Sequence, residues 1–139
     1  MTARVGQGGM AAGSMRGVAF GFLLLATLCV VGGMVWGIVM AASGDHALRS
    51  AHAHLNLVGW ATMAVFGIYY ALTPAAAVSM LARIHLGLAA VGVAALVPGV
   101  AMAVSGGGEA LAIGGSLLSL ASGALFLAVV LRHGFGRAD

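Results

Sequence analysis

Four apolar stretches, each at least about 20 residues long and therefore able to cross a bilayer as a helix, make up most of this chain. They cover residues 17–42, 51–73, 82–104 and 110–131, and charged residues occur only at or beyond their ends. The sequence therefore predicts an all-α membrane protein with four transmembrane helices.

Composition excludes several classes of protein. Hydrophobic residues make up 62% of the 139 residues, and charged residues only 6%. A water-soluble domain carries about a quarter charged residues, so we exclude a soluble enzyme, a disordered tail and a nucleic-acid-binding domain, although the pI is near 10.0. The lipid bilayer is the expected partner, and nucleic acid is not. The one cysteine, Cys29, cannot form an intrachain disulfide and is expected to be a small buried hydrophobe.

The distribution of arginine predicts the orientation in the membrane. If the helices alternate in direction, one side of the membrane holds most of the arginines: Arg4, Arg16, Arg83, Arg132 and Arg137. The other side holds Asp45, Arg49 and Glu109. By the positive-inside rule both termini are cytoplasmic. We expect a mobile cytoplasmic tail over residues 1–16, a four-helix transmembrane domain over 17–133 and a second cytoplasmic tail over 134–139.

Small residues recur at four-residue spacing in the first and fourth stretches. The pairs and triplet are Gly17 and Gly21, Gly33 and Gly37, and Gly115, Ser119 and Gly123. This spacing lets helix backbones approach closely in lipid. It predicts helix packing, either within one chain or between subunits.

Ionisable side chains in or near a membrane span are candidates for function, because lipid penalises them. Two of the five histidines have ordinary explanations, and a third is left open. We expect His133 to be solvated beyond Arg132, and His85 to lie at the membrane interface. His46, in an outer loop, is left open as a loop residue, a metal ligand or a proton-transfer group.

His52 and His54 open the second stretch and are more informative. Two residues on an α-helix are about 200° apart, so the two imidazoles leave opposite faces and cannot bind one metal ion together. Each would serve a separate site, and neutral imidazole is a common axial ligand of haem iron. Gly59 lacks a side chain near the His54 face, where a flat macrocycle could lie. Two interfacial histidines that merely begin a span remain the alternative.

A longer motif surrounds these histidines: His52-x-His54-x-x-x-x-Gly59-Trp60, followed by Phe66-Gly67, Tyr69-Tyr70 and Pro74. It resembles the tenth helix of haem–copper oxidase catalytic subunits, above all of C-type cytochrome c oxidases and their nitric-oxide-reductase relatives. The resemblance implies that His52 matches a high-spin haem ligand and His54 a low-spin haem ligand. It also implies an electron-transfer role in the bacterial inner (plasma) membrane. It is weak outside this helix.

The chain departs from that family at the copper site. It lacks the copper-site histidines, and its only tyrosines are Tyr69 and Tyr70, near the cytoplasmic end. We therefore do not expect one chain to reduce oxygen by itself. The family subunit is similar to three four-helix units around a pseudo-threefold axis. Three copies of this chain, as a cyclic homotrimer, would place His52 of one subunit opposite His54 of the next with haem between them, and a twofold dimer is the next choice.

The expected cofactor is haem b, because covalent haem c needs a Cys-x-x-Cys-His motif and the chain has one cysteine. Arg49 is expected to pair with the haem propionates, and Trp60 to line the haem. Met40 or Met102 could replace a histidine ligand. Two other functions stay open: a gas-binding or haem-sensing protein, and a copper-binding protein that uses His46, His52 and His54. The sequence names neither an electron donor nor an acceptor.

Overall fold

The computed structural model describes residues 17–136. The predicted tail over residues 1–16 and the last three residues of the other predicted tail lie outside this range. The helices of the described part are α1 (Val18–Ser43), α2 (Arg49–His54), the π-helix η1 (Leu55–Thr62), α3 (Met63–Leu72), α4 (Pro74–Ala77), α5 (Met80–Val104) and α6 (Ala110–His133). Over these residues the fold is all-helical, as predicted.

Four helical spans in this part of the chain are long and apolar enough to cross a membrane. The second of them is continuous through α2, η1 and α3, so it runs over Arg49–Leu72. Each span agrees with a predicted stretch to within a few residues. The chain is therefore a multi-pass integral membrane protein, and its apolar helices contact the lipid bilayer.

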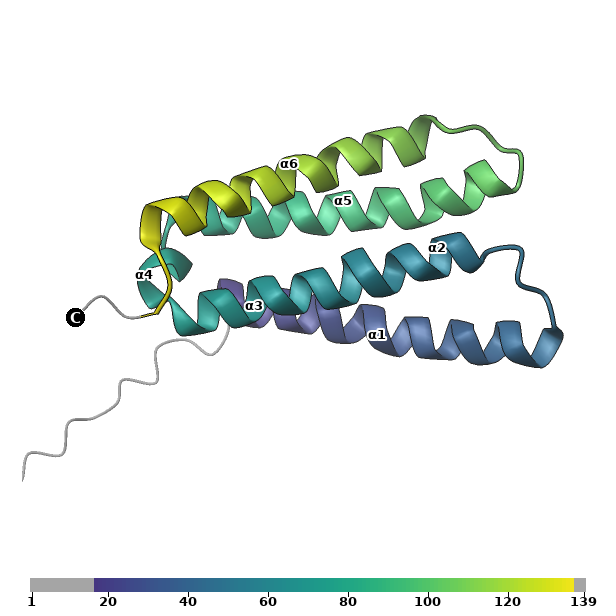
Figure 1. Ribbon diagram of the computed structural model, residues 1–139, viewed down its shortest axis with the longest axis horizontal. Coiled ribbons are helices and arrows are strands. Elements are labelled where there is room, and N and C mark those ends of the chain that lie inside the picture. The colour runs from purple at the N-terminus through teal and green to yellow at the C-terminus, as the bar shows by residue number, and fades with distance from the viewer. Residues whose placement is uncertain (1–16, 137–139) are drawn as a thin grey trace, which may run out of the picture.

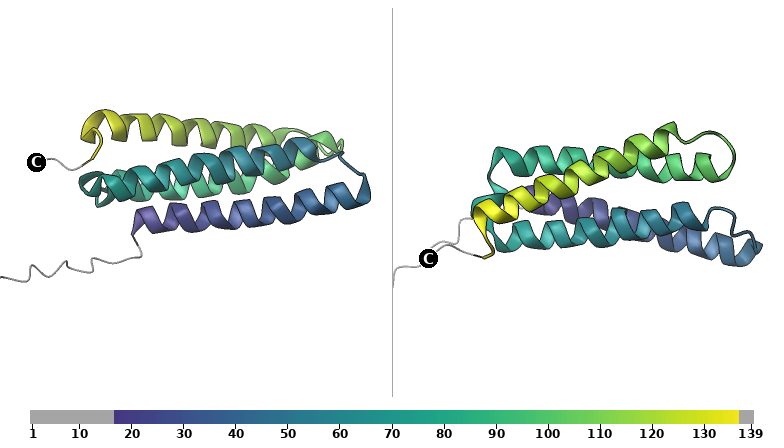
Figure 2. Two further views of the ribbon diagram at one scale, coloured as in Figure 1. Left: turned by 60° about the horizontal axis from the view of Figure 1, so that its bottom comes forward. Right: turned by 45° about the horizontal axis from the view of Figure 1, so that its top comes forward.

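The spans run up and down in two hairpins (Figure 1). One hairpin pairs α1 with the second span, and the other pairs α5 with α6, while the short α4 joins them at one end. The beginning of α1 and the end of α6 lie at that same end, and the α1–α2 and α5–α6 loops lie at the other (Figures 1 and 2). Because the number of spans is even and neighbouring spans run in opposite directions, the first and last spans must begin and end at the same end of the bundle.

Glycines bring α5 and α6 together along their length. A Cβ atom on Gly115 would run into the backbone of Leu96, and one on Gly99 would run into the backbone of Ala112. Close packing at Gly115 is the result expected from its spacing. The predicted partner Gly123 has no atom within 4 Å of such a Cβ, so its packing role is not seen within one chain.

An aromatic cluster fills the centre of the bundle near the α4 end. Phe22, Phe66, Tyr70 and Phe126 surround His85, with ring centroids 4.6–5.8 Å from its own. His85 is 0% exposed, so the expectation of an interfacial His85 is wrong. The reason is helical periodicity. His85 belongs to the inward stripe of α5 that includes Ala82 and Ala89.

The chain after α6 returns to α3. The Tyr69 hydroxyl donates to the Gly134 carbonyl at 2.7 Å, and the Gly136 amide donates to Thr73 Oγ1 at 3.1 Å. His133 is the last residue of α6. Its Nε2 atom is buried, whereas the sequence predicted a solvated side chain. The described part of the predicted second tail, residues 134–136, is therefore held against the helices.

Candidate functional site

His52 is held against α1 by a groove that two glycines create. Its Nε2–H donates to the Gly33 carbonyl at 2.9 Å. A Cβ atom on Gly37 would lie 3.4 Å from the same nitrogen, which is an ordinary van der Waals contact, so the ring packs directly beside this glycine. Trp36 meets the imidazole edge-on, with ring centroids 6.0 Å apart. The small-residue pair at Gly33 and Gly37 thus admits a polar side chain from the second span.

Asn56 lies one helical turn after His52 and packs beside its imidazole. Its amide nitrogen lies 3.1 Å from His52 Nε2 and donates to the His52 carbonyl at 2.9 Å. A Cβ on Gly33 would come within 2.6 Å of Asn56 Oδ1, so Asn56 can keep its present side-chain position only because residue 33 is glycine. Asn56 was missed at the sequence level. The signal that could have found it is its four-residue spacing from His52.

His54 is arranged differently. Its Nδ1–H donates to the Ser50 carbonyl at 2.8 Å, and its side chain is half-buried at the bundle surface. No residue within 17–136 makes a hydrogen bond to its Nε2. A histidine that ligates a metal usually donates its other ring N–H to a backbone carbonyl, which fixes the tautomer and leaves a lone pair for the metal. His54 therefore fits the chemistry of an axial haem ligand.

The π-helix η1 begins directly after His54. In it, the Thr62 hydroxyl donates to the Leu57 carbonyl, five residues earlier, at 2.8 Å. π-Helical turns are rare and are frequently found at functional sites. This element was also missed by sequence reasoning, because apolar periodicity does not separate a π-helix from an α-helix.

Gly59 lies within η1 and is buried. A Cβ on Gly59 would be 2.8 Å from Cys29 Sγ and 3.2 Å from Val93 Cγ1. The space beside this glycine is therefore filled by α1 and α5 rather than left for a macrocycle. Cys29 is half-buried in this contact. Trp60, the next residue, is 43% exposed and faces outward from the bundle.

The remaining candidates lie at the same end of the bundle as His52. Arg49 is the first residue of α2 and is exposed. His46 is also exposed, and its Nδ1–H donates to the Gly44 carbonyl at 3.1 Å. Among the described residues, no three His, Cys, Asp or Glu side chains gather to hold a metal ion. The three-histidine copper site considered from sequence is thus not assembled within this part of the chain.

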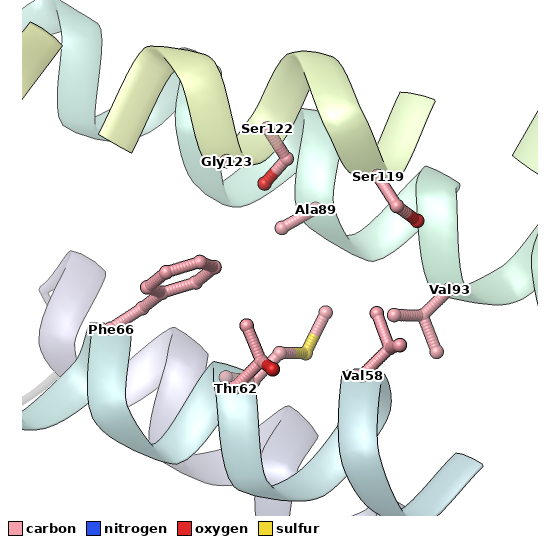
Figure 3. Close-up of a pocket in the computed structure, with 9 residues that line it drawn as sticks. Val58, Thr62, Phe66, Ala89, Val93, Ser119, Ser122 and Gly123 are labelled. Atoms are coloured by element: carbon pink, nitrogen blue, oxygen red, sulfur yellow. The ribbon is translucent and has the colours of Figure 1, made fainter. Parts of the chain in front are cut away.

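A small cavity lies between the second span and the α5–α6 hairpin (Figure 3). Its volume is about 70 Å³ and most of its lining is apolar, including Val58, Phe66 and Val93. The hydroxyls of Ser119 and Ser122 also line it and have no hydrogen-bond partner among the described residues. It has room for about two water molecules, far less than a porphyrin needs. This cavity therefore cannot hold a haem.

These features define a class: a multi-pass helical membrane protein with two histidines at one end of its second span. The chain matches no known protein family, no curated protein and no solved structure.

Proposed function

We propose that this protein is a membrane-bound b-type haem protein that transfers electrons and binds haem at the interface between subunits. The observation that carries the proposal is the hydrogen bonding of the two ring nitrogens of His54. Its Nδ1–H is anchored on the Ser50 carbonyl, and no described residue makes a hydrogen bond to its Nε2, which leaves that lone pair for a metal. The resemblance of the His52–Pro74 segment to haem–copper oxidase helices supports the same cofactor.

The second axial ligand would come from another subunit, because His52 and His54 leave opposite faces of one helix. In a cyclic trimer, His54 of one subunit would face His52 of the next. The resembled family has this threefold layout. Ligation through His52 Nε2 would require the opposite tautomer of this ring and loss of its 2.9 Å hydrogen bond to Gly33.

A twofold dimer is the second candidate, and one observation favours it. Two His54 side chains could bind one iron without disturbing the hydrogen bond between His52 and Gly33. The two assemblies differ in stoichiometry, since the trimer binds one haem per chain and the dimer one haem per two chains. The cyclic trimer pairs every His52 with a His54, whereas the dimer leaves each His52 without a partner iron.

The other residues of the site would position the cofactor. Arg49, exposed at the start of α2, would pair with a haem propionate, since guanidinium binds carboxylates with two parallel hydrogen bonds. Trp60, exposed on the outside of the bundle, would line the haem. Haem iron then supplies one-electron chemistry. With both termini cytoplasmic, as the arginine distribution favours, the site opens to the outer side of the bacterial inner membrane.

An absorption spectrum of the purified, dithionite-reduced protein tests the proposal. We expect sharp α and β bands of six-coordinate low-spin haem. A broad high-spin spectrum that shifts with carbon monoxide would instead indicate a gas-binding or haem-sensing protein. Absence of a Soret band after expression with sufficient haem would refute haem binding.

Native mass spectrometry in mild detergent then separates the assemblies. A trimer with three haems supports pairing of His52 with His54, and a dimer with one haem supports pairing of His54 with itself. A monomer with one six-coordinate haem would contradict a shared site. It would point to a methionine ligand such as Met102, which is 47% exposed.

A further inference from the structure

A large open groove lies beside the short helix α4. Figure 1 shows that α4 joins the two hairpins at this end of the bundle. Its volume is about 900 Å³, and its walls come from α1, α3, α4 and α5. Most of the lining is apolar and includes exposed side chains such as Phe20, Leu24 and Val78. It is separate from the histidine site, which lies at the opposite end of the molecule.

Arg83 is the one charged residue in the described lining of this groove. It is exposed in the first turn of α5. The two carboxylates in the described range, Asp45 and Glu109, lie in the loops at the other end of the bundle (Figure 1). Within residues 17–136, the groove therefore combines an apolar wall with a cation that has no anion at its own end.

We propose that this groove binds an anionic phospholipid, with an acyl chain along the apolar wall and the phosphate on Arg83. Guanidinium binds phosphate oxygens with two parallel charge-assisted hydrogen bonds. Basic pockets between helices on the cytoplasmic side of membrane proteins bind anionic headgroups in this way. The lipid would come from the cytoplasmic leaflet, because the groove lies at the arginine-rich end of the bundle.

Native mass spectrometry of detergent-purified protein tests this inference with two probes that have the same acyl chains, phosphatidylglycerol and phosphatidylcholine. We expect phosphatidylglycerol to bind more tightly. The Arg83→Gln variant should lose about tenfold in affinity for phosphatidylglycerol, as expected for one hydrogen-bonded charge pair. Arg132→Gln is the matched control, because Arg132 is exposed at the same end of the bundle but does not line the groove.

A second pair of variants tests the apolar wall without changing charge. Ala71 lines the groove and is exposed, whereas Ala75 is exposed outside it. Ala71→Phe should weaken binding of both lipids, and Ala75→Phe should weaken neither. Equal affinity for the two headgroups, or full retention of phosphatidylglycerol by Arg83→Gln, would overturn the proposal. So would equal behaviour of the two phenylalanine variants.

Discussion

Replacement of Gly33 by alanine tests how α1 holds the histidine-bearing span. In the wild-type protein, Gly33 accepts a hydrogen bond from His52 and leaves space for the side chain of Asn56. A Cβ at this position would lie 2.6 Å from Asn56 Oδ1 and 3.0 Å from its Cγ. Asn56 must therefore move and release its contacts with His52. The neighbouring Gly32 is the matched control, since a Cβ there meets nothing within 4 Å.

The expected magnitude follows from three contributions. Alanine gains up to about 1 kcal/mol over glycine inside a helix. Overpacking costs about 1–3 kcal/mol, and each lost hydrogen bond of Asn56 costs about 1 kcal/mol. Gly33→Ala should therefore destabilise the fold by about 1–3 kcal/mol, whereas Gly32→Ala should be neutral or stabilising by about 1 kcal/mol.

Thermal unfolding in detergent, followed by far-UV circular dichroism, measures this difference. We expect the Tm of Gly33→Ala to lie at least about 5 °C below that of Gly32→Ala. Adding Asn56→Ala to Gly33→Ala removes the clash, so the double-mutant cycle should show a favourable coupling of about 1 kcal/mol or more. Equal Tm values for the two glycine variants would refute this account of the contact between α1 and the second span.

Three further predictions concern the α5–α6 hairpin, the buried aromatic cluster and the cofactor. Gly115→Ala should lower the free energy of unfolding by about 2 kcal/mol or more relative to Gly114→Ala, because its Cβ meets backbone that cannot rotate away. A Cβ on Gly114 meets nothing within 4 Å. Chemical unfolding measures the difference, and equal stability of both variants and the wild type would contradict the prediction. Tyr70→Phe should cost about 1–3 kcal/mol, because it removes the 2.9 Å hydrogen bond to buried His85 Nδ1. Adding His85→Phe should recover most of that loss, and a double variant no more stable than the single one would contradict this. Any haem should be extracted by acidified acetone as haem b, since Cys29 alone cannot form the two thioether bonds of haem c; a pyridine haemochrome spectrum of thioether-linked haem would show otherwise.

The four spans could be predicted from sequence because the physical signal is strong. Charged residues in a bilayer are costly, so the positions of Arg49, Arg83 and Glu109 limit where helices can cross. The ends of the helices also follow local chemistry. Ser79 caps α5 by accepting a hydrogen bond from the Ala82 amide, and Gly44 ends α1 with a φ of 69°.

The inside of the bundle was harder to predict, because helices that are apolar all round have no clear inward face. His85 follows Arg83 by two residues, which suggested an interfacial position, yet the two side chains leave different faces of α5. The spacing of His52 and His54 predicted opposite faces of one helix. It could not predict which would be fixed by Gly33, since that contact joins residues 19 apart in sequence.

The most direct test of the central claim is the reduced absorption spectrum of the His54→Ala variant beside His133→Ala. His54 Nε2 has no hydrogen-bond partner among the described residues and lies near the start of the second span, whereas His133 has its Nε2 buried at the far end of α6. We predict that His54→Ala loses the low-spin α and β bands and that His133→Ala keeps the wild-type spectrum. If His54→Ala retains the wild-type Soret and α bands, His54 is not a haem ligand and the proposed function is wrong.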